Sequence, residues 1–145
     1  MATAQSIGGE PAFIFVVTPA PPLNQWIADV HALLGEVGAP PQLTRYHRPA
    51  VTVGASGVVI SEKKLGRILT IPRLVIQGVQ AGSISLKPQG HLGSTTYQTV
   101  WMAIGHRGQS LSVALTPVVG SYGTVSTIYA QSLANSIAET IRPNA

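Results

Sequence analysis

The sequence predicts an α+β fold: a small antiparallel β-sheet, barrel or sandwich, with one helix near the N-terminus and one closing C-terminal helix. Apolar residues at spacings of three and four mark the two helices, and short alternating segments separated by turns fill residues 51–116. The strand–helix–strand alternation of parallel sheets is missing. The chain has 145 residues and no cysteine, so residues 1–145 are expected to form a single domain with a core that needs no disulfides.

An arm, a strand and a helix are expected first. Residues 1–12 are small and polar and should form an N-terminal arm, and residues 13–38 should hold the strand and the helix. The run Phe13–Val17 is rich in β-formers, and the prolines after it end the strand. The helix should begin with Asn24 as its N-cap and stop at Gly38. Its apolar face comprises Leu23, Trp26, Ile27, Val30, Leu33, Leu34 and Val37.

The β core is expected over residues 51–116. Turns are predicted at residues 55–57 and 62–66, and Pro72, which lacks an N–H, marks an edge, a bulge or a break. The clearest hairpin joins Tyr97–Ile104 to Ser110–Thr116. Its second strand alternates apolar and small or polar residues, which predicts one buried face and one exposed face.

The closing helix is expected over residues 124–142. An apolar stripe should cover the open face of the sheet, including part of Leu111, Val113 and Leu115; it comprises Val125, Ile128, Tyr129, Leu133, Ile137 and Ile141. The opposite face is small and nearly uncharged. It either packs on another protein or is simply solvated, and its interface candidates are Ser126, Gln131, Ala134, Asn135 and Ala138.

The chain carries unusually little charge. Charged residues make up 10% of it, against roughly 25% in ordinary soluble domains, while apolar residues make up 45%. Either partner proteins cover part of the surface, or a monomer is solvated by Ser, Thr and Gln. The net charge is +4, and every Lys and Arg except Arg142 lies between Arg45 and Arg107, where Glu62 is the only acid. This basic segment could meet phosphate or lipid head groups, or form solvated strand edges and turns.

Catalytic chemistry finds little support in the sequence. Asp29 and His31 diverge by about 200° around their helix, and His47, His91 and His106 lie in separate loops or strand ends. No metal-ligand spacing, dinucleotide fingerprint or phosphate loop occurs. We therefore predict no catalytic residue, no metal, no cofactor and no small-molecule substrate; the alternative is an uncharacterised hydrolase.

Targeting signals are also missing from the sequence. Residues 1–9 carry no Lys or Arg, and the apolar run Phe13–Val17 is far shorter than the roughly 20 residues that a membrane span needs. The chain is therefore expected in the cytoplasm or in a virion.

The segment Val51–Val53, Gly57–Ile60, Leu69–Arg73 and Ile76–Val79 resembles bacterial pleckstrin-homology-like domains. The later hairpin and the closing helix are similar to the end of that fold, whereas the helix at 23–37 and the missing membrane anchor depart from it. The resemblance implies a non-enzymatic module that organises proteins or binds anionic groups. Lys63, Lys64, Arg67 and Arg73 are then the anion-binding candidates. Small viral tail and neck proteins also combine a first helix, a sheet and a last helix.

Two hypotheses follow from the sequence. The first is a non-catalytic structural or scaffold domain that self-associates or joins other subunits of an assembly, such as a viral tail or neck. The second is an adaptor that binds anionic lipid, nucleic acid or a protein partner through its basic loop.

Overall fold

A computed structural model describes residues 4–7, 10–19, 21–44, 46–86, 93, 95–119 and 123–141. Its antiparallel sheets and two helices make the fold α+β, which confirms the predicted class. The first sheet has the order β1 (Ala4–Ile7), β2 (Glu10–Val16), β3 (Ala50–Gly54), β4 (Gly57–Glu62) and β5 (Gly66–Pro72). The second has the order β6 (Ile76–Leu86), β7 (Thr95–His106) and β8 (Gln109–Leu115). The remaining elements are α1 (Pro21–Leu33), the 3-10 turn η1 (Arg73–Val75), the pair β9 (Val118–Val119) and β10 (Gly123–Thr124), and α2 (Thr127–Ile141).

The expected N-terminal arm contains a hairpin instead. β1 pairs antiparallel with the beginning of β2, from Ala4 opposite Phe13 to Ile7 opposite Glu10. Strand pairing supplies partners for the backbone of small, polar residues that a hydrophobic pattern does not mark as a strand.

Helix α1 begins and ends earlier than the sequence predicts. Pro21 begins it, because a proline in the first turn needs no N–H partner. The expected cap Asn24 instead lies inside the helix, where its side-chain amide donates to the Leu43 carbonyl and accepts from the Leu43 N–H, both at 2.8 Å. The helix ends at Leu33, and Gly35 rather than Gly38 provides the C-terminal stop: Gly35 has φ 73°, and its N–H and that of Glu36 bond back to the last helical turn.

The chain leaves the first sheet at Pro72. β5 ends there, and η1 carries the chain into the second sheet, so the predicted break at Pro72 is where the sheets separate. The sheets meet again beyond the end of β2, where Val17 bridges Pro117 and the Thr18 N–H donates to the Thr116 carbonyl at 2.9 Å. The two sheets therefore enclose one core. Its most buried members include Val51, Val53, Ile60, Ile71, Met102, Ile104 and Leu115.

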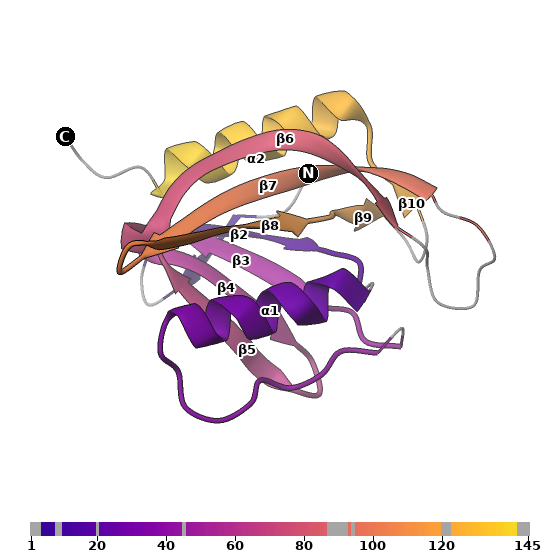
Figure 1. The fold of residues 1–145 in the computed structure, drawn as a ribbon. Helices are drawn as coiled ribbons and strands as arrows, with labels where there is room; N and C mark the ends of the chain where they lie inside the picture. The colour runs from indigo at the N-terminus through magenta and orange to yellow at the C-terminus, as the bar shows by residue number, and fades with distance from the viewer. Residues whose placement is uncertain are drawn as a thin grey trace.

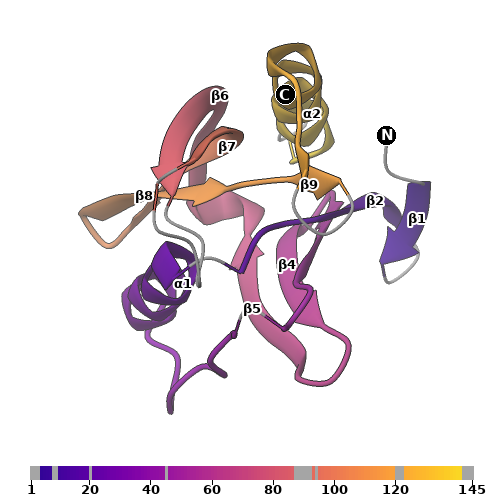
Figure 2. The same ribbon diagram turned by 90° about the vertical axis from the view of Figure 1, so that its right-hand side faces the viewer.

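The helices lie on different sides of the second sheet. In both ribbon views α2 lies above β8 and α1 lies below it (Figures 1 and 2). α2 packs mainly on β6, and also on β7 and β3, whereas α1 packs on β8 and β5. α2 thus covers the sheet as predicted, but mainly over β6 and β7. Leu111, Val113 and Leu115 share the face of Met102, whereas α1 covers the opposite face, where Trp26 contacts Trp101.

The predicted β7–β8 hairpin is confirmed, but its exposed face is only partly exposed. Arg107 and Gly108 form its two-residue turn with φ 52° and 78°, the left-handed geometry that suits tight hairpins. Ala114, expected to face solvent, is 2% exposed. Trp101, directly opposite it, meets the ring of Trp26 from α1 edge to face at 5.8 Å.

Helix α2 is rotated from the predicted orientation. Its buried residues are Ala130, Leu133, Ala134, Ile137 and Ile141, whereas Ile128 is 82% exposed. Small side chains at 130 and 134 let the helix approach the sheet closely, which favours this stripe over one containing Ile128. Ser126 caps the helix, because its hydroxyl accepts the Tyr129 N–H at 3.1 Å.

Truncating Leu133 should test this orientation. Leu133 is 1% exposed, so Leu133→Ala should lower the free energy of unfolding by about 2–5 kcal/mol through lost burial and a residual cavity. Ser132→Ala, on the exposed side of the same helix, should change it by less than about 0.5 kcal/mol. Urea denaturation of both variants checks the assignment, and equal effects would show that α2 packs differently.

Candidate functional site

The basic candidates Lys63 and Lys64 lie in the turn between β4 and β5, and both are exposed. Glu62, the acid beside them, is itself buried, and one oxygen of its carboxylate (Oε1) accepts the N–H of Lys64 at 2.6 Å and of Leu65 at 3.0 Å. Among the described residues, no carboxylate pairs with the ammonium group of Lys63 or Lys64. The Glu62 carboxylate therefore holds the backbone of the turn, and the side chains of Lys63 and Lys64 face solvent.

The surroundings of Glu62 keep its carboxylate ionised. Burial raises the pKa, but hydrogen bonds from the Leu65, Lys64 and Arg48 N–H groups and the electrostatic influence of nearby His47 lower it. The net result is a pKa below the ordinary value of 4.5. The ionised carboxylate thus joins the β4–β5 turn to the segment that precedes β3.

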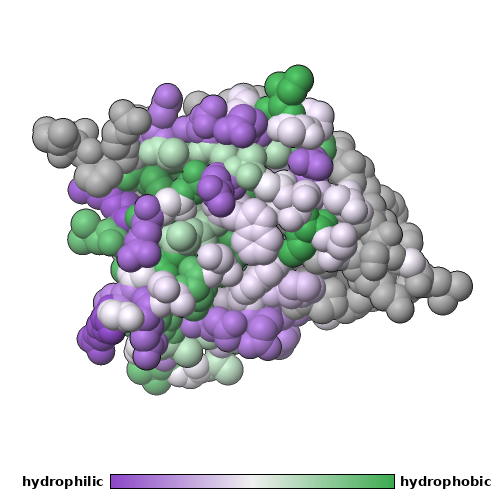
Figure 3. Space-filling model, turned by 45° about the horizontal axis from the view of Figure 1, so that its top comes forward, coloured by the Kyte–Doolittle hydropathy of each residue, from purple (hydrophilic) through white to green (hydrophobic). Residues whose placement is uncertain are grey.

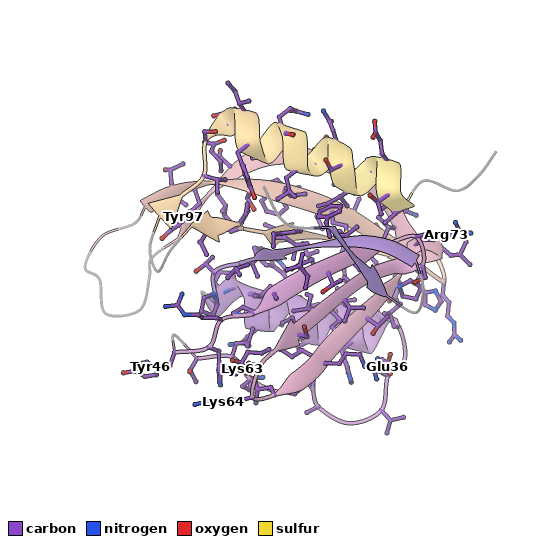
Figure 4. The ribbon with its side chains drawn as sticks, turned by 180° about the vertical axis from the view of Figure 1, so that it is seen from behind. Glu36, Tyr46, Lys63, Lys64, Arg73 and Tyr97 are labelled. Atoms are coloured by element: carbon purple, nitrogen blue, oxygen red, sulfur yellow. The ribbon has the colours of Figure 1, made fainter. Side chains whose placement is uncertain are left out.

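That segment adds residues that the sequence did not single out as site candidates. Tyr46 is 78% exposed and Arg48 is exposed, and the Thr44 N–H donates to His47 Nδ1 at 2.9 Å. Tyr46, Lys63 and Lys64 lie at the same end of the molecule (Figure 4). The Arg48 N–H hydrogen-bonds the Glu62 carboxylate, so Arg48 lies beside the β4–β5 turn. No local pattern marks this neighbour, because the contact joins segments on opposite sides of the β3–β4 hairpin.

The four predicted anion-binding residues do not form one site. Arg67 lies next to the turn, and its guanidinium donates to the Thr70 hydroxyl at 2.8 Å. Arg73 lies beyond the other end of β5 (Figure 4). The 7 residues of β5, at about 3.3 Å each, place it roughly 20 Å from the turn. The structure thus groups Lys63, Lys64 and Arg67, here called the basic turn, and separates Arg73 from it.

The interface candidates on α2 also divide. Gln131 and Asn135 are exposed and joined by a hydrogen bond of 3.2 Å, and Ser126 is exposed but serves as the cap. Ala138 is half-buried, and Ala134, at 2% exposed, belongs to the core and cannot contact a partner. The exposed stripe, here called the outer α2 face, comprises Thr127, Ile128, Gln131, Ser132, Asn135 and Glu139.

The outer α2 face carries little charge. Glu139, near its end, is its only charged residue. When the top of the molecule in Figure 1 is turned forward, pale atoms fill much of the centre of the view and hydrophilic atoms lie mainly towards the margins (Figure 3). Together with Ser136, the face lines an open hollow of about 490 Å³, to which only α2 contributes among the described residues. Such a surface suits contact with another macromolecule better than enclosure of a small molecule.

Metal-ligand and membrane-spanning features were sought as well. Over the described ranges, no group of three His, Asp or Glu side chains is close enough to hold a metal ion. Neither described helix has the length and apolar character to cross a membrane. His91 lies outside the described residues, and His47 and His106 belong to different parts of the fold.

No family model, curated protein or solved structure matches this chain. Its function must therefore be inferred from its own surfaces, of which the basic turn and the outer α2 face differ most in chemistry.

Replacing Glu62 should change how stability depends on pH. Because its pKa is lower in the folded than in the unfolded chain, the ionised carboxylate stabilises the fold above pH 4.5, and this contribution is lost as the pH falls through the folded-state pKa. Glu62→Gln should therefore be less stable than the wild type near neutral pH, and the difference should shrink in acid.

Thermal unfolding between neutral and acidic pH measures this difference. Glu36→Gln, at an exposed carboxylate in the loop after α1, is the matched control and should leave the pH dependence unchanged. A stability difference for Glu62→Gln that stays constant across the pH range would contradict the role assigned to the carboxylate.

Proposed function

We propose that this chain is a non-catalytic structural domain that works by self-association or within a larger assembly. The outer α2 face carries the proposal: Ile128 is 82% exposed there, among the uncharged side chains of Thr127, Gln131 and Ser132. Exposed helix faces normally carry charge, whereas the centres of protein interfaces are depleted of it. Contact with a partner would remove Ile128 from water.

The distribution of charge supports the same proposal. Charged residues are scarce overall, at 10%, and the basic turn collects several of them at one end of the molecule. The flank that carries α2 is left with little charge to keep copies apart. An assembly of repeated subunits, of which a viral tail or neck is one kind, is the setting in which such a flank would be covered.

Self-association should be measurable, and sensitive to Ile128. We expect the purified chain to show a mass above its monomer value of 15.1 kDa in size-exclusion chromatography with light scattering, increasingly so with concentration. Burying an Ile side chain contributes about 1.5–3 kcal/mol, so Ile128→Lys should weaken association at least about tenfold.

Val37→Lys is the matched control, since Val37 is 96% exposed in the loop after α1, away from the outer α2 face. It should associate like the wild type. A monomer of 15.1 kDa at every concentration would refute self-association.

A second candidate function is binding of an anionic surface through the basic turn. The specific observation is that the Glu62 carboxylate accepts hydrogen bonds from backbone N–H groups, whereas exposed Lys63 and Lys64 lie at the same end of the molecule as exposed Tyr46 (Figure 4). An exposed aromatic ring among cations suits phosphate-bearing partners, whether lipid head groups or nucleic acid. The pleckstrin-homology-like resemblance points to the same loop.

Removing the charges of the basic turn tests this candidate. The triple variant Lys63→Ser, Lys64→Ser and Arg67→Ser should lose binding to vesicles containing phosphatidylserine or to DNA, because each cation near an anionic surface contributes about 1 kcal/mol. Arg73→Ser, roughly 20 Å away by strand length, should bind almost like the wild type. Binding that resists salt, or an equal loss in both variants, would rule out this site.

A further inference from the structure

Strand β6 has a long edge that no described strand covers. It spans Ile76–Leu86, 11 residues, and pairs on one side with β7 along almost its whole length. In the sheet order it is the terminal strand, so among the described residues its other edge has no strand partner. Figure 1 shows it along the margin of the second sheet, beside α2.

The β6 edge lacks the features that usually keep strand edges apart. Sheet edges in soluble proteins are protected by Lys, Pro, bulges or short length, because a free edge pairs readily with another strand. β6 contains no charged residue and no proline. Its bulge between Ile76 and Gly78 affects only its beginning, so the stretch from Gly78 to Leu86 continues as regular strand.

The outer strands of the first sheet show the contrast, and β5 is the first of them. It begins beside the basic turn, carries exposed Arg67, and ends at exposed Pro72, which cannot donate to a ladder. β1, at the opposite margin of that sheet, has 4 residues. β8, the other outer strand of the second sheet, also lacks charge and proline, but it has 7 residues, and the chain just beyond it pairs with Val17 and Thr18. Among the described strands, β6 therefore has the longest unprotected edge.

The side chains along β6 would accept a copy of the same strand. Gln80, Ser83 and Ser85 are exposed, and Ala81 and Gly82 between them are small. When a strand pairs antiparallel with its own copy, each residue faces one from the same segment, so an uncharged strand meets no like charge. A two-fold symmetric contact requires such self-complementarity.

We propose that β6 pairs antiparallel with β6 of a second copy of this chain, about a two-fold axis at Gly82, the centre of the regular stretch Gly78–Leu86, so that Ala81 of each copy faces Ser83 of the other. The two three-stranded sheets then become one continuous sheet in the order β8-β7-β6-β6-β7-β8. This pairing rests on the proposed self-association: the partner is a second copy of the chain, and the contact is the edge of β6. With the axis perpendicular to the sheet, the two copies of α2 flank the axis on the same face, since α2 packs mainly on β6. The proposed interface therefore includes both the β6 edges and the outer α2 faces, and a charge on either surface should weaken it.

A charge at the centre of β6 should separate the copies. Ser83→Lys places like charges close together across the axis, so it should run as a 15.1 kDa monomer at concentrations at which the wild type is a dimer. Ser112→Lys, at an exposed position of β8 in the same sheet, should remain a dimer. Circular dichroism confirms that both variants fold. Equal dimerisation of the two would overturn the proposal.

Single cysteines test the register directly, since the natural chain has none. A mixture of Ala81→Cys and Ser83→Cys should form mixed disulfide-linked dimers under mild oxidation, because residue 81 of one copy then faces residue 83 of the other, and Ser112→Cys should not cross-link. Cross-linking no faster on β6 than at position 112 would overturn the proposal. If the wild type still associates in that case, the structural-domain proposal survives; if it is a monomer throughout, self-association fails as well.

Discussion

The structure depends on the corner at which the chain passes from the first sheet to the second. Gly57 begins β4 with φ 142°, and a side chain there would overlap the Ile71 carbonyl oxygen. Because Gly57 packs closely against the backbone of Ile71, the Arg73 N–H reaches the Ser56 carbonyl at 3.0 Å. This hydrogen bond holds η1 against the β3–β4 turn. Because Pro72 ends β5 at this point, β6 starts a new sheet rather than extending the first. The place of α2 and the open edge of β6 both follow from this turn.

Local patterns in the sequence predicted the strands of the β core, the β7–β8 hairpin, the break at Pro72 and both helices. What they missed depends on contacts between distant segments. The orientation of α2 is set by the close approach of Ala130 and Ala134 to the sheet. A hydropathy pattern would bury Ile128 in preference to these two alanines, yet Ile128 is exposed. Arg48 lies beside the basic turn only through its contact with Glu62, and the length of β5 separates Arg73 from the turn. The first hairpin has no hydrophobic alternation to reveal it.

The surfaces divide by chemistry in a way that fits a subunit better than a solitary domain. Cations gather at the basic turn, where the backbone uses the one nearby carboxylate and the positive charges face outward. The flank formed by β6 and the outer α2 face has little charge, and α2 packs directly on β6. A protein paired along β6 would present two basic turns, which strengthens binding to an extended anionic surface through multivalency. The two proposed functions are therefore compatible in one molecule.

Amide hydrogen exchange along β6, measured at high and low protein concentration, tests the self-pairing of this strand most directly. In a monomer, the N–H groups on the free edge bond to water and exchange quickly, whereas pairing protects them. We expect alternate amides between Gly78 and Leu86 to exchange more slowly as the concentration rises, while amides at the centre of β8 keep their rates. Exchange along β6 that does not change with concentration would contradict the pairing of this edge.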